Sequence, residues 1–261
     1  MLHLVNKYDL SLAIIQPTQN SLDYGFVILE TLYTTEDLRF IKRSVLFQGT
    51  LPQERERMLA ECRLEEFEAD RPLFQSGSPV HRVFLILEGV VQLFRGAEEG
   101  KHAIIGLREV GEVAGITASL SGNRHYSTAQ SIGKCRALEV PSSVFSELLE
   151  RDADLSPRLV ERLADNLQNL SMHIERLQLM QTTERLASYL LAIMPDKPQT
   201  CGKNDVTDIL LPCDKGVIAT YLGMERESFS RSLKKLRSVG VVSKGRRIQI
   251  TDPAALKELC N

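Results

Sequence analysis

Residues 223–240, GMERESFSRSLKKLRSVG, constrain the fold most because their periodicity predicts a helix with two different faces. Phe229, Leu233 and Leu236 recur at helical spacing and form an apolar stripe that must pack against a core. The opposite face carries an acceptor, a hydroxyl, a guanidinium and an ammonium, on Glu227, Ser230, Arg231 and Lys234. Such a ridge suits base edges and phosphates. A charged ridge on an isolated helix is usually only a solvated face, so the neighbouring segments decide its meaning.

Those neighbours are typical of a winged helix-turn-helix. Residues 214–222, DKGVIATYL, predict a short helix with Asp214 as its N-cap, and Gly223 supplies the turn between the two helices. Gly240 can end the second helix. Residues 241–250 then predict two short strands around Gly245, a hairpin that carries three basic side chains, Lys244, Arg246 and Arg247. This order of elements favours a DNA-binding module.

The chemistry of the ridge predicts how DNA is recognised. At the start of a helix in the major groove, Arg231 can reach guanine O6 and N7, Glu227 can accept from a cytosine amino group, and Ser230 can contact a neighbouring base or phosphate. We expect Arg226 to add a phosphate or a further base. The remaining basic residues of the module should mainly contact the DNA backbone: Lys215, Lys234, Lys244, Arg246 and Arg247. The alternative is a ligand-binding or partner-docking protein whose winged helix contacts other proteins.

The charge is distributed unevenly along the 261 residues. The net charge is −2, but residues 201–261 contain 11 Lys and Arg against 7 Asp and Glu, so that this part is basic and the remainder acidic. A basic terminal module on an acidic body is typical of a nucleic-acid-binding protein with a separate control domain. No apolar run approaches the roughly 18 residues of a membrane span, and no secretory signal is evident, so we expect a cytoplasmic protein without membrane contact.

Enzymatic and zinc-binding signatures are missing from the sequence. The five cysteines are widely spread, with no C-x-x-C and no histidines at zinc-ligand spacing. No G-x-S-x-G, H-E-x-x-H or Walker motif occurs. We therefore expect no catalytic residues and no enzyme activity.

The first part of the chain predicts a β-rich domain. Residues 1–35 are interpreted as an N-terminal extension, and the next segment, to Cys62, suggests two helices interrupted near residues 49–52. Residues 64–144 consist of short apolar runs punctuated by glycines, as in an antiparallel sandwich or barrel. We expect this domain to span residues 36–152.

Residues 153–181 predict a long helix with a coiled-coil seam. Five apolar side chains follow alternating spacings of four and three, namely Leu163, Leu167, Leu170, Ile174 and Leu177. Leu159, Leu179 and Met180 lie off this seam and are expected to contact the protein's own first domain, which leaves the seam for a second subunit. The alternative is a helix that packs only on its own sheet. A further helix at 182–194 and a polar connector at 195–208 begin the last domain, 182–261.

This order of elements resembles the cAMP receptor protein and fumarate-nitrate reductase regulator (Crp/Fnr) family of bacterial transcription factors. The most specific stretches are residues 73–94 (LFQSGSPVHRVFLILEGVVQLF), 110–115 (VGEVAG), 182–191 (TTERLASYLL) and 223–231 (GMERESFSR). The resemblance implies an α+β fold: an antiparallel β-roll like the cyclic-nucleotide-binding jelly roll, a long dimerisation helix and a C-terminal winged helix-turn-helix. It also implies a homodimer that binds inverted half-sites resembling TTGA in double-stranded DNA, contacts RNA polymerase, and reorients its DNA-binding domains when the β-roll binds an effector.

The effector segment departs from the cyclic-nucleotide binders of this family. The corresponding pocket would involve Gly111, Glu112, Gly115, His125, Tyr126 and Ser127. Cyclic-nucleotide binders carry Gly-Glu followed by Arg-Ser, whereas here Ile116 follows Gly115 and Tyr126 precedes Ser127. The cysteine cluster of the iron–sulfur branch is also missing. The segment resembles instead the branch that senses nitric oxide through haem, and His173 and His125 are the candidate axial ligands of a haem b. A cyclic nucleotide or another small molecule is the alternative effector.

Overall fold

The structure is a computed structural model that describes residues 33–96, 102–122, 124–195 and 206–260. Most of the N-terminal extension expected at 1–35 therefore lies outside the described residues. Two helices open the described chain, α2 (Thr35–Arg43) and α3 (Pro52–Leu59), as the sequence predicted. A capping box between Thr34 and Asp37 fixes the start of α2.

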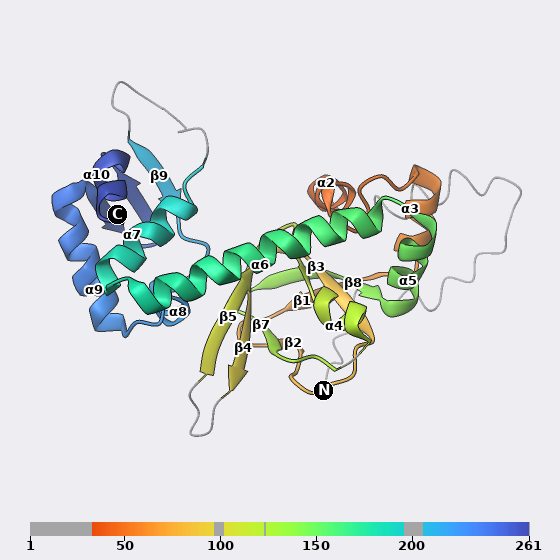
Figure 1. Ribbon diagram of the computed structural model, residues 1–261. Coiled ribbons are helices and arrows are strands. Elements are labelled where there is room, and N and C mark those ends of the chain that lie inside the picture. The colour runs from red at the N-terminus through yellow and green to blue at the C-terminus, as the bar shows by residue number, and fades with distance from the viewer. Residues whose placement is uncertain (1–32, 97–101, 123, 196–205, 261) are drawn as a thin grey trace, which may run out of the picture.

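Two four-stranded antiparallel sheets form the β-roll (Figure 1). The first sheet has the order β1-β8-β3-β6, with bounds Arg63–Phe67, Cys135–Pro141, Arg82–Glu88 and Val113–Ala114. The second has the order β2-β7-β4-β5, with bounds Pro72–Phe74, Thr128–Ser131, Val91–Gly96 and His102–Arg108. Phe84 and Ile86 of β3 fill the space between the sheets together with Val91 and Leu93 of β4. The predicted antiparallel β-domain is confirmed.

A second core lies on the other face of the first sheet. Leu85, Leu138 and Val140 point to this side, where they meet Ile41 of α2 and Phe145 of α5 (Ser142–Arg151). Leu155 and Leu159, at the start of the long helix α6 (Leu155–Leu179), pack into the same core. This packing anchors one end of α6 to the β-roll, and the rest of the helix extends beyond it (Figure 1).

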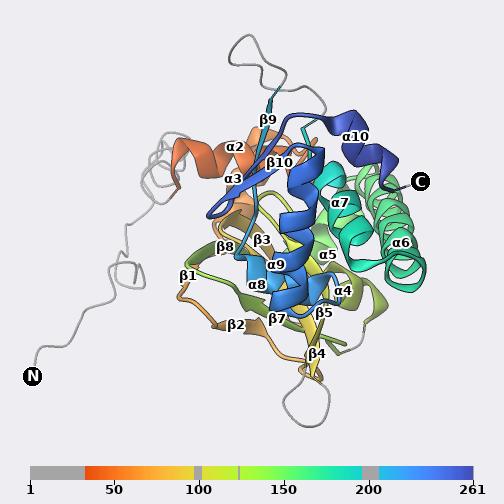
Figure 2. The same cartoon turned by 90° about the vertical axis from the view of Figure 1, so that its left-hand side faces the viewer.

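The C-terminal domain is a winged helix-turn-helix. Its helices are α7 (Thr182–Ala192), α8 (Lys215–Tyr221), α9 (Arg226–Lys235) and α10 (Pro253–Glu258). Its sheet has the order β10-β11-β9, with bounds Val241–Lys244, Arg247–Ile250 and Thr207–Leu210. Phe229 of α9 is buried in this domain's core together with Leu186 and Leu190 of α7. In Figure 2 α9 faces the viewer, at the end of the molecule that points away from the β-roll.

The C-terminal domain contacts the rest of the chain at two places. Leu107 of β5 and Ile132 pack against the core of the C-terminal domain, and α8 lies against β5. On α6, the ring of His173 stacks on Tyr221 of α8, with centroids 4.5 Å apart and planes 9° from parallel. The first helix of the helix-turn-helix is therefore held by both the β-roll and the long helix.

Arg185 of α7 joins the end of α6 to the turn of the helix-turn-helix. Its guanidinium donates to the carbonyls of Leu222 (2.7 Å) and Met180 (3.0 Å), and more weakly to those of Leu177 (3.2 Å) and Gly223 (3.4 Å). Gly223 has φ +63°, and a Cβ there would lie 3.0 Å from a methyl carbon of Leu177. The turn therefore requires glycine for its backbone conformation and for its close approach to α6.

Several details differ from the sequence-based expectations. The residues 195–208 expected as a connector end in strand β9, which adds a third strand to the wing sheet. The second helix expected to reach Gly240 ends at Lys235, and Leu236–Val239 form a 3-10 turn. Leu179 was expected to pack on the first domain, but its side chain is 76% exposed because α6 has passed the β-roll at this point. None of the described helices is long and apolar enough to cross a membrane.

Candidate nucleic-acid interface and effector cavity

The ridge predicted on α9 is exposed along its whole length. Glu227, Ser230, Arg231 and Lys234 are all accessible, whereas Phe229 and Leu236 are buried beneath them. The hydroxyl of the buried Ser232 lies 3.3–3.4 Å from the hydroxyls of Thr182 and Thr183, so α7 supports α9 from behind. Arg231 makes only a side-chain contact with Ser228, at 3.1 Å on the same helix, and remains available to a ligand in front of the ridge.

Arg226, at the start of α9, lies over α8. A Cβ added to Gly216 would come within 2.8 Å of the Nε of Arg226, so the absence of a side chain at Gly216 makes room for the guanidinium. Lys215, the first residue of α8, donates to the hydroxyl of Ser243 in the wing at 2.5 Å. These contacts bring the N-terminal ends of both helices and the wing to one basic surface.

The three basic residues of the wing have different environments. Lys244 and Arg247 are exposed around the Gly245 turn. Arg246, which we expect to contact the DNA backbone, also donates its Nε and one terminal nitrogen to the carbonyl of Leu211 and the same nitrogen to that of Pro212. It therefore has a structural role that the sequence did not suggest: it holds the hairpin against the segment before α8.

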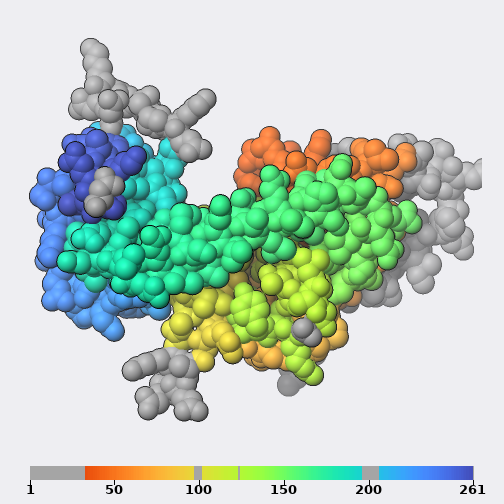
Figure 3. Space-filling view, viewed as in Figure 1, coloured from red at the N-terminus to blue at the C-terminus, as the bar shows by residue number. Residues whose placement is uncertain are grey.

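The predicted seam of α6 is uncovered in the single chain. Its side chains Leu167, Leu170, Ile174 and Leu177 are 66%, 45%, 46% and 37% exposed. Val160, which the sequence analysis did not include, continues the same spacing by one step toward the N-terminus and is also exposed. In Figure 3, α6 forms an open ridge across the molecule. An apolar stripe of this length is typical of a surface that pairs with a second helix.

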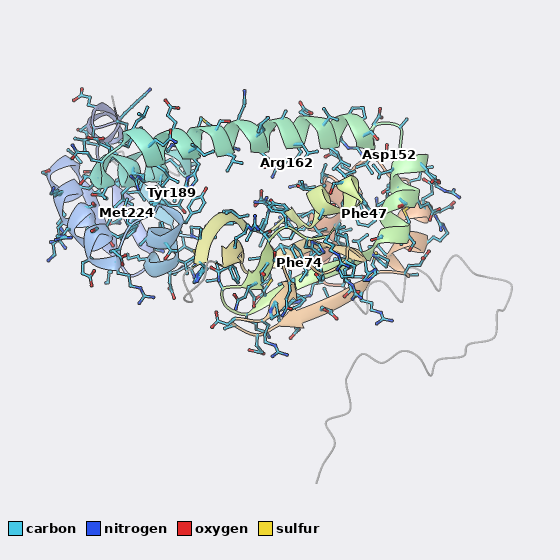
Figure 4. The ribbon with its side chains drawn as sticks, turned by 60° about the horizontal axis from the view of Figure 1, so that its bottom comes forward. Phe47, Phe74, Asp152, Arg162, Tyr189 and Met224 are labelled. Carbon is cyan, nitrogen blue, oxygen red and sulfur yellow. The ribbon has the colours of Figure 1, made fainter. Side chains whose placement is uncertain are left out.

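A cavity of about 400 Å³ lies between the β-roll and the first half of α6. All six residues predicted for the effector pocket line it: Gly111, Glu112, Gly115, His125, Tyr126 and Ser127. The sequence did not foresee the contributions of the end of α2, with Arg43, of the loop after it, with Val45 and Gln48, or of α6, with Arg158 and Arg162. In Figure 4, Arg162 lies on the side of α6 that faces the β-roll. Leu163 of the predicted seam also borders the cavity.

His125 and His173, the two histidines predicted to hold haem, lie in different places. His125 is on the cavity wall, 3% exposed, and its ring stacks on Phe74 with centroids 3.8 Å apart. His173 is 7% exposed and stacks on Tyr221, outside the set of residues that line the cavity. Burial lowers the pKa of both imidazoles, with His81 adding to the effect at His125, and Arg176 and Arg185 at His173.

Comparison with known proteins decides the family. Residues 64–152 match the cyclic nucleotide-binding domain, and residues 184–259 match the Crp-like helix-turn-helix domain. The chain belongs to the Crp/Fnr family. It is 27% identical over 196 residues to the global nitrogen regulator of Nostoc sp., a match that covers 74% of this chain and 87% of that protein. It is also 28% identical over 208 residues to the nitrogen fixation regulation protein FixK of Bradyrhizobium diazoefficiens, covering 75% of this chain and 85% of the relative.

The fold agrees with a solved structure of the same family. FixK2 from Bradyrhizobium japonicum superposes with a TM-score of 0.67 at 23% identity, over 77% of this chain and 98% of that one. Like other Crp/Fnr proteins, this chain is thus a DNA-binding transcription regulator, and its matched relatives are regulators rather than enzymes. The comparisons do not assign it to the haem-containing branch of the Crp/Fnr family.

The residues present do not fit a haem. Haem needs an axial ligand beside a broad apolar surface for the macrocycle. The walls of this Crp/Fnr cavity carry four arginines and three carboxylates, from Arg43, Arg108, Arg158, Arg162, Glu112, Glu161 and Asp165. His125, the one candidate ligand on the wall, has a ring face against Phe74, and the other candidate is outside the cavity. A haem in this cavity is therefore not supported by the residues that line it.

A cyclic nucleotide also lacks its usual partners here. Arg124 is the basic residue nearest to the expected Arg-Ser position, but its guanidinium donates to the carbonyl of Gly77 at 2.8 Å. Arg124 does not line the cavity, and Ile116 occupies the position after Gly115 where the cyclic-nucleotide binders carry an acid. The cavity thus lies in the domain that matches the cyclic nucleotide-binding family but lacks these two polar partners.

Proposed function

We propose that the protein is a homodimeric transcription regulator that binds an inverted-repeat operator and responds to an effector in the cavity beside α6. The exposed ridge of α9, backed by a buried apolar face, is the observation that carries this proposal. The exposed seam of α6 is the surface against which a second subunit would pack. A two-fold dimer formed in this way presents two α9 helices to two half-sites. Such half-sites lie about 34 Å apart, one turn of the double helix.

The base contacts follow from the order of side chains on α9. The guanidinium of Arg231 suits guanine, the carboxylate of Glu227 accepts from cytosine, and Ser230 contacts a neighbouring base or phosphate. Their Glu-x-x-Ser-Arg arrangement favours half-sites that resemble TTGA. Lys215, Lys234, Lys244 and Arg247 surround these residues and add phosphate contacts. By family resemblance, RNA polymerase is the partner that the bound dimer contacts.

Binding to duplexes of two designs tests this function. The first duplex contains two inverted TTGA half-sites, and the second has one half-site scrambled. We expect the intact operator to bind far more tightly, with an affinity that falls steeply as salt rises, because each neutralised phosphate releases counterions. Fluorescence anisotropy over a salt series measures both properties.

The competing function, a partner-docking protein whose winged helix contacts other proteins, predicts a different result. Such a protein would bind neither duplex, or would bind both equally and without dependence on salt. The exposed ridge favours DNA, since Arg226, Arg231, Lys234, Lys244 and Arg247 lie on the same module as an accessible recognition helix.

A further inference from the structure

The arginines on the cavity wall are unevenly neutralised. Arg162 pairs with Glu112 at 2.9 Å, and Arg158 pairs with Asp152 at 2.5 Å. Among the described residues no ion pair is formed by Arg108, which donates instead to the carbonyl of its neighbour Leu107 at 2.7 Å. The carboxylates of Glu161 and Asp165 lie on exposed residues of α6, and the guanidinium of Arg43 lies on an exposed residue at the end of α2. Among the described residues, Arg158 and Arg162 therefore have one carboxylate partner each, and Arg108 has none.

Arg158 is incompletely satisfied. Its side chain is 21% exposed and its Nε is buried, and this Nε has no hydrogen-bond partner within the described part of the chain. A buried donor of a charged group without a partner is destabilising, so such a group is a natural contact for an anionic ligand. Arg158 is also fixed on the wall, because Asp152 holds one of its terminal nitrogens.

The pair between Arg162 and Glu112 is weak enough to be exchanged. The Arg162 side chain is 49% exposed and that of Glu112 is 29% exposed. Ion pairs at such accessible positions contribute little to stability because water screens both charges. A ligand carboxylate or phosphate could therefore take the place of Glu112 beside Arg162 at little cost.

We propose that the effector of this cavity is a small dianion, either a dicarboxylate or a phosphate monoester, held by Arg158 and Arg162. The proposal rests on the function assigned above and specifies the chemistry of its effector. The volume of about 400 Å³ lies at the small end of ligand pockets and suits a metabolite of this size. Ser127 and Thr117 on the wall offer hydroxyl groups to the ligand's polar atoms.

A dianion bound in the cavity would affect residues that contact the DNA-binding domain. Glu112, once displaced from Arg162, would release a link between α6 and the loop that joins β5 to β6. At the end of β5, Arg108 lines the cavity, and the adjacent Leu107 packs against the core of the C-terminal domain. The same short segment therefore contacts both the ligand and the domain that carries α9.

Isothermal titration of the full-length protein with a panel of probes tests the proposal. The panel contains dicarboxylates of four to six carbons, phosphate monoesters of three-carbon and six-carbon alcohols, the neutral diamide succinamide, cyclic AMP and haemin. We expect at least one dianion to bind, and succinamide, cyclic AMP and haemin not to bind. The proposal is overturned if no dianion binds, if succinamide binds as tightly as succinate, or if haemin gives a Soret shift that His125→Ala abolishes.

Three variants assign the site. Arg158→Gln and Arg162→Gln should each weaken the bound dianion by about 10–100-fold, as expected for the loss of a charge-assisted contact. Glu112→Gln should have the opposite effect and tighten binding several-fold, because it removes the competitor for Arg162. Arg124→Gln is the matched control: this arginine belongs to the same segment as His125 but donates to Gly77 outside the cavity, so its loss should leave dianion affinity unchanged.

Misfolding and failure of the DNA-binding function can be separated from failure of this proposal. Arg162 is half exposed, so Arg162→Gln is expected to remain folded even if Arg158→Gln does not, and thermal unfolding without ligand checks both variants. If the wild type binds its operator but no dianion, the effector assignment is wrong and the proposed function stands. Dianion affinity that is the same in Arg162→Gln, Glu112→Gln and the wild type would also contradict the proposal.

Discussion

The two domains differ in how their binding sites are built. In the C-terminal domain, the principal recognition residues lie within one turn and a half of α9, on a convex surface supported by Phe229 and Ser232. In the β-roll, the cavity is assembled from the loop after α2, from β5 and β6, from α4 (Ile116–Ser121) and the segment before β7, and from α6. The residues of a convex site on one helix can be identified from the local sequence. Those of a concave site cannot, because the cavity is formed by segments that only the fold brings together.

This difference explains how the two sites relate to the family. The DNA-binding helix keeps the Glu-x-x-Ser-Arg order. The cavity lies between the β-roll and α6, and its cationic groups come from α2, β5 and α6 rather than from the segment around His125. We therefore expect the cavity and the DNA-binding helix to respond to substitutions independently of each other. The predictions below test this separation, from the largest expected effect to the smallest.

Disruption of the seam should have the largest effect on operator binding, because we expect each subunit of the dimer to contact one half-site. Charges at the helix interface, in the double variant Leu170→Glu/Ile174→Glu, should produce monomers, since unpaired buried charges are strongly destabilising. Loss of the second half-site should weaken operator binding by about 10²–10⁴-fold. Sedimentation and anisotropy measure the two outcomes. Gln168→Glu, on an exposed residue off the seam, is the control, and a double variant that remains dimeric would place the subunit contact elsewhere.

Loss of the Arg185 contacts should have the next largest effect. Arg185→Gln removes donors to carbonyls at the end of α6 and in the helix-turn-helix turn, and should destabilise the C-terminal domain by about 1–3 kcal/mol. Operator affinity should fall without a change in the preferred sequence. Thermal denaturation and duplex binding test this, with the exposed Arg237→Gln as control. Equal stability of the two variants would show that Arg185 does not stabilise the contact between the end of α6 and the turn of the helix-turn-helix.

A change at the wing should affect all DNA sequences alike. Lys244→Ala removes a contact to the DNA backbone, so it should weaken operator and scrambled duplexes by the same factor and reduce the magnitude of the salt slope by about 1. Arg246→Ala should instead lower the stability of the domain, because Arg246 holds the carbonyls of Leu211 and Pro212. Anisotropy and thermal unfolding distinguish them. If Lys244→Ala changed the relative affinities of the two duplexes, Lys244 would be a base contact.

Acidification should have the smallest effect, and it should lower stability through the contact between His173 of α6 and Tyr221 of α8. His173 resists protonation in the folded state because it is buried and lies near Arg176 and Arg185, whereas in the unfolded chain it titrates near its ordinary pKa of 6.5. Stability should therefore be constant above about pH 7 and fall as the pH drops through 6.5, since the unfolded state then binds more protons. His125 contributes with the same sign.

The variant His173→Gln separates the two histidines. Unfolding midpoints measured between about pH 5 and 8 should retain only part of the wild-type dependence, with His125 accounting for the remainder. An unchanged dependence in the variant would show that His173 is not the group that titrates.

Much of the fold could be predicted from the sequence where the pattern is periodic and local. Such patterns occur in three places: the α6 helix with its seam, the helix-turn-helix around Gly223, and the strands around Gly89 and Gly245. Strand β9 could not be foreseen, because its four residues form a strand only by pairing with β11. The exposure of Leu179 likewise depends on where the β-roll ends beneath α6, which the spacing of leucines does not contain.

The candidate sites divide in the same way. The exposure of Arg226, Glu227, Ser230 and Arg231 follows from the helical period and the buried position of Phe229. The roles of Arg158, Arg162 and Arg246 depend on partners between 6 and 50 residues away in the chain. No local motif signals these contacts. The stacking of His173 on Tyr221 is a further example, since an isolated histidine on a helix carries no information about the ring it will meet.

Selection of binding sites from random duplexes tests most directly the claim that α9 recognises bases through Arg231. For the wild type, we predict two inverted half-sites that resemble TTGA. For Arg231→Ala, we predict the same spacing, an affinity lower by about 1–3 kcal/mol, and loss of preference at a single base pair in each half-site. The same consensus from both proteins would contradict the assignment of Arg231 as the guanine contact, and a wild type that selects no inverted repeat would contradict the account of the DNA-binding domain.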